Sequence, residues 1–281
     1  MKQVLFPTTL DALFRLLAEL PESPIMAGGT DLLVSLRAAD REKRPLIALE
    51  RLEEFSAVSA QPDGGVSIGP CVSFGRIMTH PLLAGRYSIL TQAAGTVGGP
   101  AIRNMATLGG NIVTASPAGD SLPPLYLLAA VLEISAASGS RILPIDRFIC
   151  SPRTTVLQPG EVISRILLPP PGAWDLQWFE KVGKRRSLAI AVASLAAMIR
   201  LEGECVADAR LAWGSVGPTV LRCPAAEQAL IGRPLSGKSL ATAAGYARET
   251  VRPIDDLRAS AAYRRAVAGN LLMRLNLRAS L

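Results

Sequence analysis

Apolar residues recur at regular intervals from the start of the chain, and their spacing predicts the first helix. Within residues 8–20, five apolar residues follow the i, i+3, i+4, i+7 pattern of one helix face: Leu10, Leu13, Phe14, Leu17 and Leu20. Thr8 or Thr9 can cap this helix through its hydroxyl oxygen, and Pro21 ends it. The segment is therefore expected to be an amphipathic helix with one buried face.

Shorter apolar runs predict that strands and helices follow one another through the rest of the first 170 residues. Strands are expected at residues 25–27, 46–49, 66–69, 132–135 and 162–168. Helices are expected at residues 32–37, 74–78 and 90–97, the last of them ended by Gly98, Gly99 and Pro100. The proline cluster at residues 169–172 follows the last strand and marks the clearest domain boundary of the chain.

The last third of the chain is richer in alanine, and its pattern is less decisive. Residues 178–181 are expected to be extended, and the alternation over residues 208–216 predicts a strand. Residues 189–201 fit a buried strand or a buried helix equally well. Helices are expected at residues 224–231, 239–251 and 261–279.

Length and composition indicate a globular protein of about two domains. The chain has 281 residues, of which 49% are hydrophobic and 19% charged, and domains average roughly 150 residues. The mean hydropathy of +0.30 is apolar for a soluble protein. Either the large alanine and leucine content or a surface reserved for partner subunits accounts for this value.

The apolar segments do not predict a membrane span or a cleaved signal. The longest apolar stretch, residues 188–199, is well short of the roughly 20 residues that a span requires. Asp11 interrupts the N-terminal region before an apolar signal segment can form. We therefore expect a cytoplasmic protein.

The charge and the cysteines narrow the possible ligands. The net charge is +7, but the charges are dispersed and aromatic residues are only 5%, which argues against a nucleic-acid-binding surface. An anionic cofactor or an acidic partner subunit fits the basic excess better. None of the four cysteines forms a C-x-x-C pair, so we expect buried, reduced thiols and no metal site. The single histidine, His80, is expected at a loop or a helix end.

Two glycine-containing segments carry the candidate chemistry. The first glycine motif, residues 27–32, follows a predicted strand, and the second glycine motif is residues 107–111. Glycines allow close approach of the backbone, and successive N–H groups in such turns bind anions such as phosphate. Either motif taken alone could equally be a tight structural turn. Neither is a G-x-G-x-x-G fingerprint or a Walker motif, so two separate phosphate-binding turns imply another architecture.

Polar residues accompany the second glycine motif. Thr107 and Asn111 offer a hydroxyl and an amide, and residues 116–120 follow closely. Asp120 offers an acceptor suited to ribose or ribityl hydroxyls.

Six segments together resemble a known family. They are residues 25–32, 102–111, 115–120, 159–161, 179–181 and 211–216. In this order, over nearly the whole chain, they resemble the FAD subunit of molybdenum hydroxylases, the medium subunit of xanthine dehydrogenase, carbon monoxide dehydrogenase and related enzymes. The combination is far more specific than either glycine motif alone.

The resemblance implies an α+β fold with two domains. Residues 1–171 would form an FAD-binding domain of the vanillyl-alcohol oxidase (PCMH) type, with two subdomains divided near residues 55–60. Residues 172–281 would form the smaller C-terminal α/β domain of molybdenum hydroxylase flavoprotein subunits. The residues that would bind FAD are Ile25, Met26, Ala27, Gly28, Gly29, Thr30, Asp31, Leu32, Val97, Ile102, Thr107, Gly109, Gly110, Asn111, Ser116, Asp120, Ile163 and Lys181.

The same resemblance implies a role in electron transfer. FAD in this chain would accept electrons from a [2Fe-2S] small subunit, while a large subunit with the molybdopterin cofactor oxidises the substrate. The electrons would pass to NAD or another acceptor. Some xanthine dehydrogenases carry an acidic residue after the equivalent of residues 184–186, where this chain has residues 187–189, so the acceptor stays open. A self-sufficient flavoenzyme and a scaffold without FAD are the alternative functions.

Overall fold

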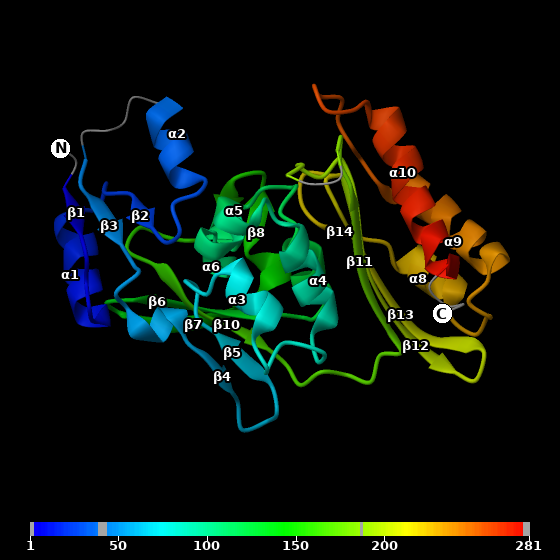
Figure 1. The fold of residues 1–281 in the computed structure, drawn as a ribbon, viewed down its shortest axis with the longest axis horizontal. Coiled ribbons are helices and arrows are strands. Elements are labelled where there is room, and N and C mark those ends of the chain that lie inside the picture. The colour runs from blue at the N-terminus through cyan, green and yellow to red at the C-terminus, as the bar shows by residue number, and fades with distance from the viewer. Residues whose placement is uncertain (1–2, 39–43, 186–187, 278–281) are drawn as a thin grey trace.

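The N-terminal region is a small parallel sheet with two helices. The computed structural model describes residues 3–38, 44–185 and 188–277. The first elements are β1 (Val4–Leu5), α1 (Leu10–Glu19), β2 (Ile25–Met26), α2 (Leu32–Ala38) and β3 (Leu46–Ala48). The strand order is β1-β3-β2, with both outer strands parallel to β3 (Figure 1).

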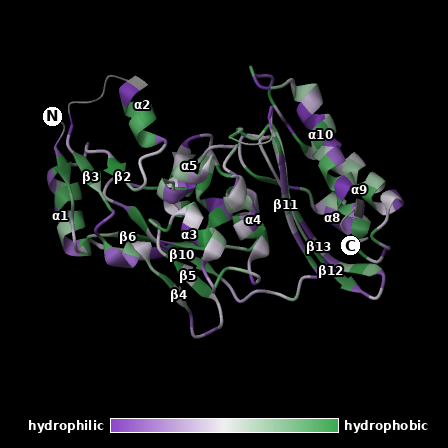
Figure 2. Cartoon of the chain, viewed as in Figure 1, coloured by the Kyte–Doolittle hydropathy of each residue, from purple (hydrophilic) through white to green (hydrophobic). Residues whose placement is uncertain are grey.

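Helix α1 confirms the amphipathic pattern. The Thr9 hydroxyl caps it by accepting from the Ala12 N–H at 3.2 Å. Leu13 and Leu17 are buried in a cluster with Ile47 and Phe55, while the opposite side of the helix is polar (Figure 2).

The second region surrounds a five-stranded antiparallel sheet. Its strands are β4 (Val58–Ala60), β5 (Val66–Ile68), β6 (Val131–Ala136), β7 (Gly139–Pro144) and β10 (Val162–Leu168), in the order β4-β5-β10-β6-β7. Its helices are α3 (Phe74–Thr79), α4 (Ser88–Thr96), α5 (Pro100–Met105), α6 (Leu108–Thr114) and α7 (Leu122–Leu127). Short elements complete it: the pair β8 (Ile149–Ser151) and β9 (Thr154–Thr155), and the 3-10 turns η1 (Glu53–Ser56) and η2 (Ile145–Arg147).

The second glycine motif differs from the turn that was expected. It begins helix α6, with Thr107 as N-cap and both glycines in the first helical turn. The capping hydrogen bond stabilises this helix start despite the low helix propensity of glycine. Pro100, expected among the residues that end a helix, lies in the first turn of α5, where its missing N–H costs nothing.

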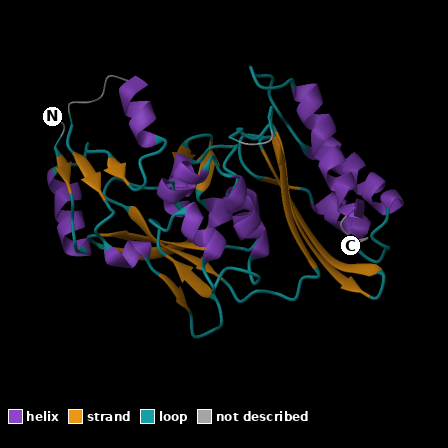
Figure 3. Ribbon diagram, viewed as in Figure 1, coloured by secondary structure: helices purple, strands orange, loops and turns teal. Residues whose placement is uncertain are grey.

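The C-terminal region is a four-stranded antiparallel sheet covered by helices (Figure 3). Its strands are β11 (Leu176–Val182), β12 (Ala193–Glu202), β13 (Cys205–Gly214) and β14 (Leu221–Arg222), in sequential order. Its helices are α8 (Pro224–Leu230), α9 (Gly237–Thr250) and α10 (Ala261–Met273), followed by the 3-10 turn η3 (Arg274–Leu277). The last α-helix is thus shorter than predicted, and residues 278 and 279 lie outside the described part.

The structure decides the open assignment of residues 189–201, most of which form strand β12. The strand is buried along residues 193–199 because both faces of its sheet are covered. Helices α8 to α10 lie against one face, and α4 and α7 contact the sheet from the other side (Figure 1). A strand buried on both faces loses the polar alternation that would have identified it.

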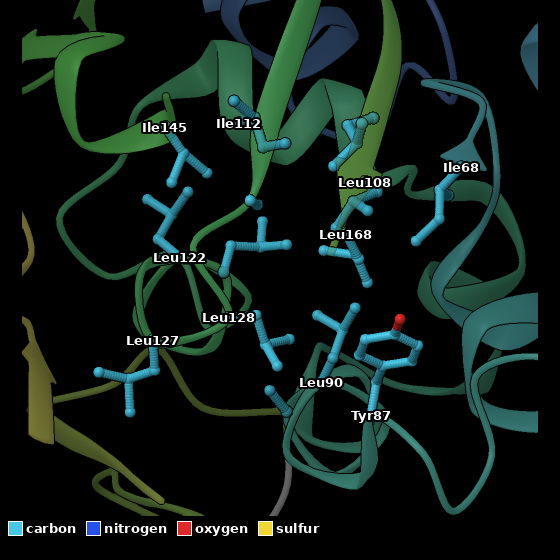
Figure 4. Close-up of a cluster of buried hydrophobic side chains, with 14 of the residues drawn as sticks. Ile68, Tyr87, Leu90, Leu108, Ile112, Leu122, Leu127, Leu128, Ile145 and Leu168 are labelled. Atoms are coloured by element: carbon cyan, nitrogen blue, oxygen red, sulfur yellow. The ribbon is translucent and has the colours of Figure 1, made fainter. Parts of the chain in front are cut away.

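The largest hydrophobic core joins the second and third regions. Figure 4 shows part of it, with Tyr87 and Leu90 of the α4 region near Leu168 of β10. The same cluster includes Phe179 of β11 and Met198 of β12. The C-terminal sheet therefore packs directly on the helices of the second region. This shared, close-packed core fixes the position of the two regions relative to each other.

The cysteines and the histidine give mixed outcomes. Only Cys223 is buried, whereas Cys150 is exposed and Cys71 and Cys205 are partly buried, so the expectation of four buried thiols is wrong. Burial raises the pKa of the Cys71 thiol to about 12, with a smaller contribution from Glu50. His80 lies at the C-terminal end of α3, as expected. Within the described residues, no helix has the length and apolar character needed to cross a membrane.

Candidate functional site

A cavity of about 950 Å³ lies between the glycine motifs and the C-terminal sheet. It is lined by every residue that the resemblance assigned to cofactor binding except Met26: Ile25, Ala27, Gly28, Gly29, Thr30, Asp31, Leu32, Val97, Ile102, Thr107, Gly109, Gly110, Asn111, Ser116, Asp120, Ile163 and Lys181. Met26 lies in β2, where it pairs with Ala48 of β3. The structure thus brings together residues from all three regions around one space.

The first glycine motif presents a row of free backbone donors. No backbone N–H of residues 28–32 donates a hydrogen bond to another residue of the described chain. Gly29 has φ +70°, the left-handed region that glycine adopts without strain. A Cβ on Gly28 would lie 1.7 Å from the Met105 carbonyl oxygen, so the motif approaches α5 more closely than any side chain permits. Such a row of unpaired N–H groups is suited to an anion.

Asp31 ties this motif to the second region by its side chain. Its carboxylate accepts from Arg153 at 3.2 Å and from the Thr114 hydroxyl at 3.4 Å. Both charged side chains are about half exposed, so the pair contributes at most about 1 kcal/mol. Asp31 therefore orients the motif through its side chain, while its N–H stays available.

The second glycine motif does not offer the free backbone donors that were expected. The Leu108 N–H donates to the Val72 carbonyl at 3.0 Å, and the Gly109 N–H donates to the Pro70 carbonyl at 2.9 Å. The Gly110 N–H donates to the Thr107 hydroxyl oxygen at 3.2 Å. The expectation of a second row of free N–H groups is therefore wrong, because these groups stabilise the start of α6.

The two glycines of this motif face different surroundings. A Cβ on Gly109 would lie 2.5 Å from the Pro70 Cβ and 2.8 Å from its carbonyl oxygen. A Cβ on Gly110 would meet only the Thr107 hydroxyl oxygen, at 2.9 Å. Gly110 lines the cavity, so a larger side chain there would reduce the space available to a ligand. Gly109 is needed for packing, and Gly110 keeps the cavity wall flat.

A buried ion pair forms another part of the wall. Lys181 of β11 bonds to the Asp120 carboxylate, and it also donates to the Thr96 carbonyl at 2.7 Å. The Thr96 hydroxyl donates to the same Asp120 oxygen at 3.1 Å. The second carboxylate oxygen, Oδ1, is buried and has no hydrogen-bond partner in the described part of the chain. Burial raises the pKa of Asp120, and Lys181 and Thr96 lower it only in part.

Apart from Lys181 of β11, the resemblance assigned no role to the wall formed by the C-terminal region. Arg264 of α10 is 4% exposed and bonds to Asp256 at 2.7 Å, and it lines the cavity together with Ser215. Desolvation raises the pKa of Asp256, but hydrogen bonds from Arg264, from Arg258 and from nearby backbone N–H groups leave that pKa well below its usual range. The only signal in the sequence was the 211–216 segment, which carried the resemblance without a site role.

These features suit a nucleotide cofactor. Free backbone donors suit a phosphate, a buried carboxylate oxygen suits a hydroxyl donor, and apolar side chains suit aromatic rings. The cavity volume lies in the range of small-molecule and cofactor sites.

Comparison with known proteins identifies the family. Residues 1–171 match the FAD-binding domain in molybdopterin dehydrogenase, and residues 178–279 match the CO dehydrogenase flavoprotein C-terminal domain. The chain is 31% identical to the xanthine dehydrogenase FAD-binding subunit of Escherichia coli O157:H7, over 91% of this chain and 88% of that one. The chain belongs to the family of FAD-binding flavoprotein subunits of xanthine and carbon monoxide dehydrogenases.

Solved structures share the whole fold. Quinoline 2-oxidoreductase from Pseudomonas putida 86 aligns with a TM-score of 0.93 and 28% identity, covering 100% of this chain and 97% of that one. A carbon monoxide dehydrogenase from Hydrogenophaga pseudoflava aligns with a TM-score of 0.91 and 29% identity, covering 97% and 95%. The α+β architecture expected from the sequence, with an FAD-binding domain followed by a C-terminal domain, is confirmed.

Proposed function

We propose that this chain is the electron-transfer subunit of a molybdopterin-dependent hydroxylase or dehydrogenase. A [2Fe-2S] subunit delivers electrons to it, a molybdopterin-containing large subunit oxidises the substrate, and NAD or another acceptor removes the electrons. Bound FAD supplies the redox chemistry by accepting two electrons, and the protein supplies binding and orientation. Membership of the flavoprotein-subunit family supports this proposal.

The free N–H groups of residues 28–32 are the observation that carries the proposal. They would hold the FAD pyrophosphate, with the residues of the second glycine motif closing against it. Asp120 would accept a hydrogen bond from a sugar or ribityl hydroxyl at its unpartnered Oδ1. Lys181 would keep that carboxylate charged and oriented. Val97, Ile102 and Ile163 would contact the cofactor through apolar surface.

We also propose that residues 1–171 form one domain and residues 172–281 a second. The first domain has two subdomains, which are divided near residues 55–60. The separate buried cluster of the N-terminal sheet supports the subdomain division. The proline-rich segment that precedes β11 supports the main boundary. Limited proteolysis should cut first near these positions. A cytoplasmic location is part of the proposal and is tested by cell fractionation.

FAD release tests the binding part of this proposal. The purified chain should release FAD, in preference to FMN, when it is denatured by heat and the supernatant is separated. Release should be complete because no histidine or cysteine lies in either glycine motif to attach the flavin covalently. A colourless supernatant, or one that contains only FMN, contradicts the proposal.

Co-expression tests the partners. The chain should elute from size exclusion as a larger complex when it is produced with the genes encoded beside it. That complex should contain molybdenum and iron and should oxidise a substrate, whereas the chain alone should not oxidise a purine or an aldehyde. Turnover by the chain alone would favour a self-sufficient flavoenzyme.

A further inference from the structure

Ser215 has an unusual backbone conformation at the wall of the cavity. It follows β13 and has φ +63°, in the left-handed region that residues other than glycine seldom adopt. Such a conformation persists only where the surrounding structure imposes it, and it is frequent at functional sites.

Two neighbouring segments hold Ser215 in place. Its N–H donates to the Pro117 carbonyl at 2.8 Å, next to the turn that carries Asp120. Its carbonyl accepts from Arg264 Nη1 at 3.0 Å, and the same guanidinium nitrogen donates to the Val192 carbonyl at 2.7 Å. The residue is therefore fixed from the second region and from α10 at once.

The Ser215 hydroxyl has no hydrogen-bond partner among the described residues. The residue is 7% exposed and lines the cavity, and its Oγ is buried without a hydrogen bond. Buried polar atoms normally have a partner, and an unmade hydrogen bond is costly. A change of rotamer of this hydroxyl would break no hydrogen bond of the described residues. Asp120 lines the same cavity, and its Oδ1 also has no hydrogen-bond partner within the described residues.

We propose that the Ser215 hydroxyl hydrogen-bonds to the flavin half of FAD, and that Arg264 and Pro117 position it for this contact. The inference rests on the proposed binding of FAD in the cavity. Ser215 directly follows strand β13 of the C-terminal sheet. Figure 1 shows this sheet across the α3–α6 helices from β2 and α2. The contact therefore lies away from the free N–H groups that suit the pyrophosphate.

The surroundings of Ser215 suit a flavin ring. Ile190, Ala191 and Ile254 contribute apolar surface to the same cavity. A flat ring with nitrogen and carbonyl groups along one edge needs apolar contacts on its faces and a hydrogen-bond partner at that edge. Hydrogen bonds to the ring are also one means by which a protein adjusts the electronic properties of a flavin.

Titration of the Ser215→Ala and Ser215→Gly apoproteins with FAD and with ADP tests the proposal. Both variants should raise the Kd for FAD about three- to ten-fold, the effect of one lost hydrogen bond. Both should shift the visible absorption of bound FAD and leave the Kd for ADP unchanged. Glycine adopts the left-handed conformation without strain, so agreement of the two variants assigns the effect to the hydroxyl.

Thermal denaturation separates this role from a structural one. Removal of an unpartnered hydroxyl should not lower the Tm of the apoprotein, but it should lower the Tm of the FAD complex. The matched control is Ser135→Ala, since the buried Ser135 hydroxyl bonds to Ser164 away from the cavity. This control should lower both Tm values and leave the Kd and the spectrum unchanged.

Three results would overturn the proposal: an unchanged Kd and spectrum in both Ser215 variants, an equal loss of ADP affinity, or a fall in the Tm of the apoprotein that matches that of the complex. Failure of the unsubstituted chain to bind FAD would instead overturn the proposed function.

Discussion

The two glycine motifs share a pair of glycines but use their backbones in opposite ways. In the first, the N–H groups of residues 28–32 donate no hydrogen bond to any described residue. Its glycines permit a left-handed turn and close contact with α5. In the second, the N–H groups of residues 108–110 bond within the protein and start a helix. The first motif therefore leaves donors available for a ligand, whereas the second lines the cavity with N–H groups that are already bonded.

The comparison shows that a glycine pair alone does not specify its role. Gly109 is required because Pro70 lies against its Cα, which is a matter of packing. A Cβ on Gly110, one residue later, would approach only the Thr107 hydroxyl oxygen, at 2.9 Å, and no backbone atom outside its own helix. Substitutions at the two motifs should therefore separate folding from cofactor binding.

The largest effect on stability and on FAD binding is expected from substitution of Gly28. Gly28→Ala places a methyl group against the Met105 carbonyl, and neither backbone segment can move without disturbing its region. We expect a loss of about 3 kcal/mol in the free energy of unfolding and loss of FAD binding, measured by urea denaturation and flavin titration. Gly245→Ala is the control, since nothing lies within 4 Å of its added carbon, and it should not destabilise the protein. A fully stable Gly28→Ala variant would contradict this account.

Gly110→Val should abolish FAD binding with a smaller effect on folding. Its branched side chain would occupy the cavity, so we expect the Kd to rise by at least about 100-fold, roughly 3 kcal/mol. Fluorescence titration of the apoprotein measures this change, and circular dichroism reports the fold.

Gly109→Ala should lower the stability of the protein more than its affinity for FAD, the opposite of Gly110→Val. The overlap with Pro70 should cost about 2 kcal/mol of stability, while the variant that remains folded should keep most of its FAD affinity. If the Gly109 and Gly110 variants behaved alike, the distinction between packing and wall residues would be wrong.

Asp120→Ala should weaken FAD binding by about 1–3 kcal/mol, less than Gly110→Val, because it removes one charge-assisted hydrogen bond. It should also destabilise the apoprotein, because Lys181 loses its carboxylate partner in a buried position. Calorimetric titration and thermal denaturation separate the two effects. A larger effect at Asp120 than at Gly110 would show that the hydroxyl contact outweighs the shape of the cavity wall.

The smallest expected effect is the change of apoprotein stability and of FAD affinity with pH that Asp120 causes. Burial raises the pKa of Asp120 above its usual value of 3.8 in the apoprotein, so the folded apoprotein binds this proton more tightly than the unfolded chain does. The apoprotein should therefore lose stability as the pH rises from the unfolded pKa of Asp120 to its higher folded pKa. A hydroxyl of FAD that donates to the carboxylate favours its charged form, so binding releases a proton and should tighten as the pH rises above about 4. Asp120→Asn should flatten both profiles, and FAD titrations across this range measure the slope. A slope that persists in the variant would place the titrating group elsewhere.

The sequence by itself determined the local elements and the composition of the site. Helix α1 and the strands β10 and β13 followed from their apolar spacing, since each has one dominant pattern and a clear breaker or cap. The segments that resemble the flavoprotein family identified residues that the fold places around one cavity. Their roles toward FAD stay predictions.

Only the tertiary structure decided how those residues are used. Strand β12 could not be told from a helix, because the helices that bury both its faces come from other parts of the chain. Two backbone N–H groups of the second glycine motif donate to the carbonyl oxygens of Pro70 and Val72, which lie more than 30 positions earlier in the sequence. Ser215 and Arg264 are held at the cavity by hydrogen bonds to each other and to Pro117 and Val192, which are distant in the sequence. Spacing along the chain reports local preference, whereas which hydrogen bonds are already made depends on contacts that exist only in the folded protein.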